Sequence, residues 1–350
     1  MKKFFAAANT EMGFRSLFDE IFAPEKFRRI YILQGGPGTG KSTLMRNLGA
    51  VAEGEGYDVE YICCSSDPDS LDGIIIPGLF VAVLDGTAPH ATDPVYPGAV
   101  ERIVDLGVAL DFDLLEENRD LLIPLIRAKK EAYRSAYRFL SAAGSMEREH
   151  DAILRDFYLR EKAEAAVRRL LVGFQYKGAG EERRRYISAV CAKGVYRLDT
   201  LTERAERVYA VTDKTGLGYL FMDTLYDGLR REGFSIVVCR SPLTDARKEA
   251  ILLTESNVLF IVSRDGESVR ADKIVNSARF ADKDKMAEKR KRLRFIERCV
   301  ATVLDGAVFC FKDAGALHAQ AEKIYGTCVD FERVEGIMRK IIDEIFENNV

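Results

Sequence analysis

The chain has 350 residues, of which 47% are hydrophobic, and a formal net charge of −3. This length fits two domains, and the hydrophobic content excludes a disordered chain. The balanced charge predicts no overall field that would draw the protein onto nucleic acid or an acidic membrane. The 7 cysteines show no C-x-x-C spacing, which favours reduced thiols, and no apolar run is long enough to span a bilayer. We therefore expect a soluble, cytoplasmic protein without a membrane partner.

The first hundred residues have the pattern of alternating strands and helices. Apolar periodicity predicts, in chain order, a helix over 13–22, a strand over 30–33, a helix over 42–52, a strand over 57–64, an acidic loop over 65–73 and a strand over 79–84. The succession of strand, loop, helix and strand is typical of the βα unit of a parallel sheet.

The turn after the first strand matches a phosphate-binding loop. Gly35-Gly36-Pro37-Gly38-Thr39-Gly40-Lys41-Ser42 fits the pattern G-x-x-x-x-G-K-[ST] at every fixed position, and Thr43 follows. Glycines let the backbone curve around phosphate oxygens, and the following helix adds its positive N-terminal end. We expect Lys41 to neutralise the β- and γ-phosphates and the Ser42 hydroxyl to ligate Mg²⁺. Residues 35–43 are therefore predicted to bind ATP with Mg²⁺.

Such a loop needs an acid on the metal side and a group that orients water. Asp85 follows the apolar run 80–84 and is predicted to be the second Mg²⁺ ligand, at the Walker B position. Candidates for the catalytic group are His90 and the acids of the preceding loop, because the carboxyl ends of strands meet the ligand crevice. Turn and N-cap chemistry is an alternative explanation for Asp67-Pro68-Asp69-Ser70, and Asp69 and Asp72 are weaker candidates than Asp67. We retain Asp67 and His90, with Lys41, as the predicted catalytic residues.

The second half repeats the first. Charged and apolar residues mix over about 100–172, which predicts a helical segment, and a glycine-containing linker follows over 173–180. Four later segments then echo earlier ones in the same order: 184–192 matches 15–23, 207–211 matches 29–33, 233–239 matches 56–62 and 259–266 matches 79–86. The spacing differs mainly by one insertion near 198–205, and a helical tail follows over 282–349. We predict an internal duplication.

The second copy of the phosphate loop is degenerate. Asp213 stands in place of Gly35, Tyr219 in place of Lys41 and Leu220 in place of Ser42. These three changes remove the lysine charge and the metal-binding hydroxyl and add a negative charge. The second half is therefore predicted to bind no triphosphate in this mode.

Several unusual stretches accompany the loop: Asn9-Thr10 with Gly13-Phe14, the segment 64–72, and Asp85-Gly86-Thr87-Ala88-Pro89-His90 with Asp93-Pro94 and Pro97-Gly98. With these the whole chain resembles a bacterial, Firmicutes-type family of tandem P-loop ATPases with two nucleotide-binding-like halves. The resemblance implies ATP binding and ATPase activity, and it points to Asp67 and His90 as functional residues. It supplies no cellular role.

The predicted fold is α/β, with duplicated P-loop NTPase-like domains whose parallel sheets are flanked by helices and followed by helical segments. The first domain covers 1–175, with its helical segment over about 100–172, and the degenerate second domain covers 181–350. The leading function is a Mg²⁺-dependent ATPase or ATP-driven switch with one live site. A kinase for a small molecule or nucleotide, and a non-hydrolysing regulator or scaffold, remain as alternatives. A protein partner or a homo-oligomer is left open, whereas nucleic acid is not expected, because the basic runs lack interleaved aromatic residues.

Overall fold

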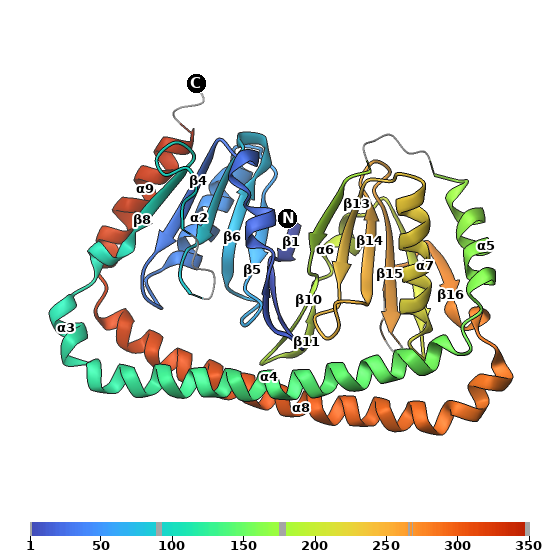
Figure 1. The fold of residues 1–350 in the computed structure, drawn as a ribbon. Coiled ribbons are helices and arrows are strands. Elements are labelled where there is room, and N and C mark those ends of the chain that lie inside the picture. The colour runs from blue at the N-terminus through green and yellow to red at the C-terminus, as the bar shows by residue number, and fades with distance from the viewer. Residues whose placement is uncertain (1, 89–92, 175–179, 265–266, 268, 347–350) are drawn as a thin grey trace.

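The computed structural model describes residues 2–88, 93–174, 180–264, 267 and 269–346. Two β-sheets with their helices lie side by side, and a pair of long helices runs along one end of both (Figure 1). None of the helices in these residues is both long enough and apolar enough to cross a membrane. The architecture is α/β, as the sequence predicts.

The first sheet has six strands in the order β1-β5-β6-β7-β4-β8. They are β1 (Lys2–Phe5), β4 (Arg29–Gln34), β5 (Glu60–Cys63), β6 (Leu71–Ile76), β7 (Val81–Asp85) and β8 (Glu101–Asp105), with short 3-10 turns η1 (Pro24–Lys26), η2 (Pro77–Leu79) and η3 (Leu106–Ala109). Helix α2 (Lys41–Gly54) packs on β6 and β7. It buries Leu44, Leu48 and Ala52, which recur every four residues and so lie on one face.

The sheets are mixed, so the prediction of parallel sheets is wrong for one strand in each. In the first sheet β6 runs antiparallel to both β5 and β7. The acidic residues and Gly73 predict a loop over 65–73. The chain instead turns back within 64–70, where Cys64 N–H bonds to the Ser70 carbonyl at 3.0 Å, and a short connection of this kind can only join antiparallel strands.

The predicted helix over 13–22 is also wrong in its first part. Residues Ala7–Thr10 (β2) and Gly13–Ser16 (β3) form a two-stranded hairpin, and only Phe18–Ile21 (α1) is helical. Gly13 has a φ of 94°, a turn conformation that glycine adopts at little cost. The apolar residues Phe14, Phe18 and Phe22 still pack in one cluster. Their spacing of four residues resembles that of a helix, although Phe14 lies in the hairpin.

The second sheet has the order β9-β13-β14-β15-β12-β16, which places its strands as the first sheet places β1, β5, β6, β7, β4 and β8. They are β9 (Glu182–Arg185), β12 (Arg207–Asp213), β13 (Ile236–Arg240), β14 (Lys248–Leu253), β15 (Val258–Arg264) and β16 (Lys273–Asn276). Here β14 is the antiparallel strand. The remaining elements are the hairpin β10 (Ser188–Cys191) and β11 (Gly194–Arg197), helices α6 (Thr200–Arg204) and α7 (Leu217–Arg231), and η4 (Ser277–Phe280).

This correspondence corrects the first of the four sequence matches. The hairpin β10–β11 takes the place of β2–β3, and α6 takes the place of α1. Residues 184–192 therefore correspond to the start of the chain rather than to 15–23, and 198–205 is no insertion. The match failed because both segments are short apolar runs beside arginine.

The two halves meet at the edges of their sheets. Phe5 of β1 and Tyr186, just after β9, exchange backbone hydrogen bonds of 2.9 and 3.1 Å. One apolar cluster contains buried residues of both sheets, among them Ile30 and Ala82 from the first and Val208 and Ile261 from the second. The halves thus share part of one core.

The helical segments cross from each half to the other. They are α3 (Phe112–Glu117), α4 (Arg119–Arg155), α5 (Arg160–Leu171), α8 (Lys283–Thr327) and α9 (Phe331–Phe346). Helices α4 and α8 pack along each other beneath both sheets (Figure 1). As a result α5 packs on α7 of the second half, and α9 packs on α2 of the first. The domain boundaries 1–175 and 181–350 stay a prediction. Helices α5 and α9 each pack on the half on the other side of these boundaries.

Candidate nucleotide site

The predicted phosphate-binding loop is a tight turn between β4 and α2. Gly38 and Gly40 have positive φ angles of 72° and 83°, which glycine adopts without steric cost. Thr39 is buried and closes the turn, because its Oγ1 donates a 2.9 Å hydrogen bond to the Gly36 carbonyl. Helix α2 begins directly afterwards, at Lys41. Its positive N-terminal end favours an anion at the turn.

Lys41 is buried, and its ammonium points back into the loop. It donates hydrogen bonds of 3.0 Å to the Gly35 carbonyl and 2.9 Å to the Gly36 carbonyl. It also lies 3.7 Å from Oδ2 of Asp85. Burial lowers the pKa of Lys41, whereas the charges of Asp85 and Glu322 raise it. The ammonium is therefore held by acceptors that phosphate oxygens could replace.

Asp85 is the last residue of β7, which pairs in parallel with β4 so that Asp85 lies opposite Leu33. Its Oδ1 accepts hydrogen bonds from the backbone N–H and the hydroxyl of Thr87, at 2.8 and 2.6 Å. Burial raises the pKa of Asp85, and the nearby Lys41 opposes that effect. Adjacent parallel strands thus bring the predicted lysine and the predicted acid to one edge of the sheet.

The donors available for Mg²⁺ are the Ser42 hydroxyl and Asp85. Ser42 Oγ accepts hydrogen bonds from the N–H of Leu71 at 3.0 Å and, at the longer distance of 3.5 Å, from Nη2 of Arg46, so a metal ion at this oxygen would replace the weaker donor. Mg²⁺ usually takes one or two protein oxygens together with substrate phosphates and waters. The described part of the chain contains no group of three or more His, Cys, Asp or Glu side chains that could hold a metal. This donor set fits an ion that arrives with a nucleotide.

Of the acids of the predicted loop over 65–73, Asp72 affects the charged groups of the site. Asp72 is buried on β6 and interacts electrostatically with both Lys41 and Asp85. Asp67 is exposed, and its Oδ1 accepts the N–H of Asp69 at 3.3 Å, as in a turn. Asp67 stays a catalytic prediction. His90 lies outside the described residues.

The end of α8 covers the loop, which no motif in the sequence indicated. The ring of Tyr325 lies so close to Gly36 that a Cβ there would be 2.7 Å from the ring. A Cβ on Gly38 would be 3.0 Å from the carbonyl oxygen of Glu322. These contacts join residues almost 300 positions apart, and only the helical spacing of 322 and 325 could have hinted that they share a face.

The corresponding turn of the second half is shorter and is filled by its own carboxylate. Residues 214–216 separate β12 from α7, whereas 35–40 separate β4 from α2. Oδ1 of Asp213 accepts the N–H of Gly218 at 3.0 Å. Burial raises the pKa of Asp213, and backbone N–H groups of the turn oppose the shift. The carboxylate thus lies at the N-terminal end of α7, the position that a bound anion would take.

The residues aligned with Lys41 and Ser42 are buried in the second half. Tyr219 and Leu220 belong to apolar clusters. The Tyr219 hydroxyl accepts a 3.2 Å hydrogen bond from Nε of Arg264, and the guanidinium of Arg247 lies 4.8 Å from its ring centre. The side chain in the lysine position is therefore part of a packed core.

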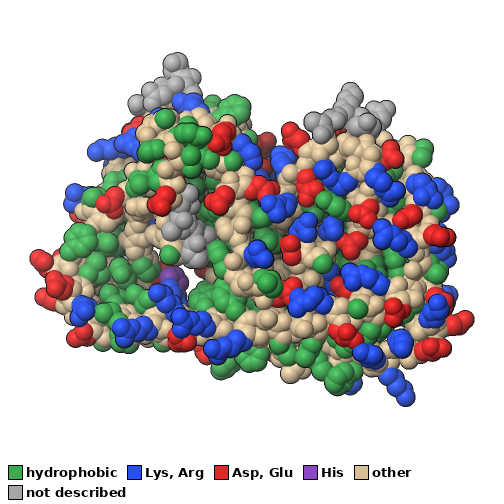
Figure 2. Space-filling view, viewed as in Figure 1, with side chains coloured by type: hydrophobic (Ala, Val, Ile, Leu, Met, Phe, Trp, Pro, Cys, Tyr) green, Lys and Arg blue, Asp and Glu red, His purple; other side chains and the backbone are tan. Residues whose placement is uncertain are grey.

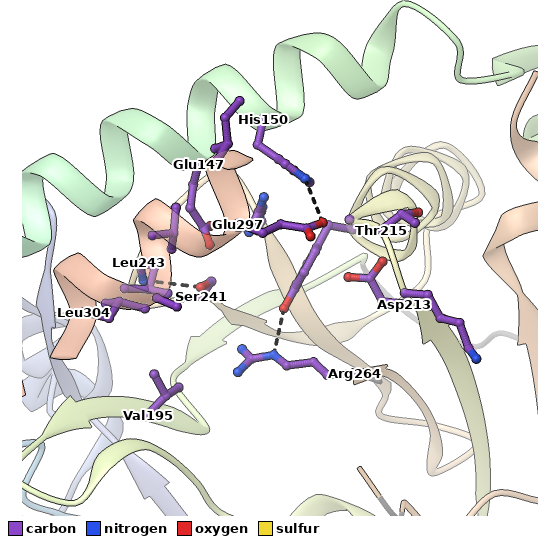
Figure 3. A pocket seen from close by; sticks show the side chains of 17 residues that line it. Glu147, His150, Val195, Asp213, Thr215, Ser241, Leu243, Arg264, Glu297 and Leu304 are labelled. Atoms are coloured by element: carbon purple, nitrogen blue, oxygen red, sulfur yellow. Dashed lines mark hydrogen bonds and ion pairs between the residues drawn. The ribbon is translucent and has the colours of Figure 1, made fainter. Parts of the chain in front are cut away.

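A cavity of about 300 Å³ lies beside this second turn, between α4, α7 and α8 (Figure 3). Its apolar wall includes Ile296, Val300 and Leu304 of α8. Among its polar groups, His150 Nε2 lies 3.3 Å from Glu297, and Arg247 pairs with Glu147. The cavity is thus open beside the turn, and several of its polar groups already have protein partners.

Comparison of the chain with protein-family models, with curated proteins and with solved structures gives no match.

Proposed function

We propose that the first half binds ATP with Mg²⁺ and hydrolyses it at a single site. The observation that carries this proposal is the position of the Lys41 ammonium, which lies 3.7 Å from the Asp85 carboxylate, inside a turn with two left-handed glycines. We take the two sheets as copies of one P-loop NTPase-like domain, because their strands follow the same order. The second copy binds no triphosphate, since Asp213 fills its turn.

In this proposal the Lys41 ammonium and the backbone N–H groups of the turn 35–40, apart from Pro37, bind the β- and γ-phosphates. The Ser42 hydroxyl and Asp85 hold Mg²⁺, which supplies charge neutralisation when bound. A water oxygen bonds to the γ-phosphorus while the bond from that phosphorus to the bridging oxygen breaks. ADP leaves with the bonding electron pair, and the water protons pass to the products. Asp67, Asp72 and His90 are the candidates that would order the water.

Titration calorimetry with Mg-ATP tests the proposal. We expect binding near one site per chain in the wild type and a loss of at least about tenfold in Lys41→Ala, because a charged contact to phosphate disappears. Lys214→Ala is the matched control, since Lys214 is an exposed lysine in the turn of the second half. Equal losses in both variants, or no binding by the wild type, would contradict a single site in the first half. Phosphate release without an added acceptor then separates a hydrolase from a kinase.

A further inference from the structure

One face of α8 follows the phosphate loop beyond the contact at Tyr325. His318, Glu322 and Tyr325 are spaced by four and three residues, so they lie along one side of the helix. At 1.5 Å per residue, His318 is about 6 Å along the axis from Glu322, whose carbonyl oxygen lies over Gly38. Burial lowers the pKa of His318, and the charge of Lys41 lowers it further whereas that of Asp67 raises it, so Lys41 and Asp67 both lie within electrostatic range of the ring. This face of α8 therefore extends toward the end of the site where a terminal phosphate would lie.

A face of α4 lies beside it. Tyr133 lies near Ser66, in the loop that follows β5, and burial raises the pKa of Tyr133 while Ser66 lowers it. Lys129, four residues earlier, lies on the same side of α4. Figure 2 shows a gap between the first half and the pair of long helices. Lys129 thus lies on the side of α4 that carries Tyr133, toward the loop after β5, whereas Lys41 lies at the start of α2.

Lys129 and His318 join the two helices at this point. Nζ of Lys129 lies 3.3 Å from Nδ1 of His318, and Nε2 of His318 lies 3.5 Å from Glu322. An ammonium can only donate, so Nδ1 accepts and Nε2 carries the ring proton toward the carboxylate. Burial, followed by the charge of Lys129, lowers the pKa of His318, in agreement with a neutral ring. A neutral imidazole is a weak partner for an ammonium compared with a phosphate oxygen.

We propose that Lys129 is a second cation of the nucleotide site. When ATP binds, Lys129 gives up its contact with His318 and binds the γ-phosphate. His318 and Glu322 act as positioning residues. This inference rests on the proposed function and adds to it. A cation supplied by the long helices would act on the charge of the terminal phosphate, as an arginine finger does. It would also make the arrangement of α4 and α8 depend on whether ATP or ADP is bound.

The test compares the affinities for ADP and for a non-hydrolysable ATP analogue by titration calorimetry in the presence of Mg²⁺. We expect the wild type to bind the analogue more tightly than ADP and Lys129→Met to reduce that ratio about tenfold, because only the analogue presents a γ-phosphate. Lys129→Arg should retain the preference. Lys130→Met is the control, because Lys130 is exposed at the next position of α4. His318→Gln should reduce the ratio less than Lys129→Met does.

Each outcome decides the inference. An unchanged ratio in Lys129→Met, with nucleotide still bound, overturns the role of Lys129 and leaves the proposed function intact. An equal weakening for both nucleotides indicates a structural role and also overturns it. Failure of the wild type to bind either nucleotide contradicts the proposed function and this inference together. Should Lys129→Met be unfolded by circular dichroism, Lys129→Gln, which keeps a polar side chain, is judged by the same ratio.

Discussion

Gly36 is the residue at which the long helix and the phosphate loop come closest. A methyl group there would lie 2.7 Å from the ring of Tyr325, well inside contact distance. We expect Gly36→Ala to lower the free energy of unfolding by about 1–3 kcal/mol, because the ring or the helix end must move. Chemical denaturation measures the effect.

The double variant Gly36→Ala/Tyr325→Leu should lose less than the sum of its two single variants, since leucine lacks the ring that the methyl group meets. Gly54→Ala serves as the control. Gly54 lies in α2 with open space around its Cα, so alanine should raise stability by about 0.5–1 kcal/mol. Additive losses in the double variant would show that the ring does not cause the cost.

At this scale the sequence predicts only the local part of the candidate site. Residues 35–42 could be predicted as a phosphate-binding turn because the motif consists of consecutive residues. Asp85 could be predicted as the acid because it ends an apolar strand. The sequence could not predict the positions of Lys129, His318 and Tyr325. These residues lie on helices far along the chain, and the residues next to them do not indicate which loop they approach. Asp72 lies on β6, where the acidic pattern predicts a loop, so its burial near Lys41 could not be predicted.

At the scale of elements, a buried ion-pair group fixes α4 to the second half. The guanidinium of Arg247 is buried and bonds to both carboxylate oxygens of Asp151, at 2.6–3.2 Å, as well as to Glu147. Removal of one acid leaves a buried charge only partly compensated. We therefore expect Asp151→Leu to lower the free energy of unfolding by about 3–5 kcal/mol, measured by denaturant titration.

An exposed ion pair gives the matched comparison. Arg160 and Asp227 join α5 to α7 at 3.2 Å, but their side chains are 65% and 47% exposed. Asp227→Ala should therefore change stability by no more than about 1 kcal/mol. A similar small loss in Asp151→Leu would mean that water reaches Arg247 and that this group does not hold α4 in place.

The sequence missed short strands both within the first sheet, as with β6, and at its edges. Strand β8 begins at Glu101, where a helix was expected, and its buried carboxylate accepts the backbone N–H groups of Val95 and Tyr96. Alternation over four or five residues is too brief to separate a strand from a helix turn. The central strands β4 and β7 were predicted, because both of their faces are buried and they form continuous apolar runs.

At the scale of the whole molecule, the last helix of each half stabilises the other half. Ile341 of α9 is 4% exposed within the core of the first sheet, and Leu171 of α5 is 8% exposed within the core of the second. Local periodicity predicted both helices but could not assign their partners. Each half could pack on the last helix of its own sequence or on that of the other half. The direction in which α4 and α8 run determines which arrangement forms.

Hydrogen exchange with mass spectrometry can test this exchange of helices. Ile341→Ala removes packing from the first core, worth about 2–5 kcal/mol, although residue 341 belongs to the second half of the chain. We expect faster exchange in β4 and α2 and little change in α7, because local opening follows the lost contacts. Leu171→Ala, the matched substitution, should do the reverse, with faster exchange in α7 and unchanged exchange in α2. If each substitution instead loosened the half in which it is encoded, the chain would fold as two independent units, and α8 would no longer be available to connect the second half to the phosphate loop.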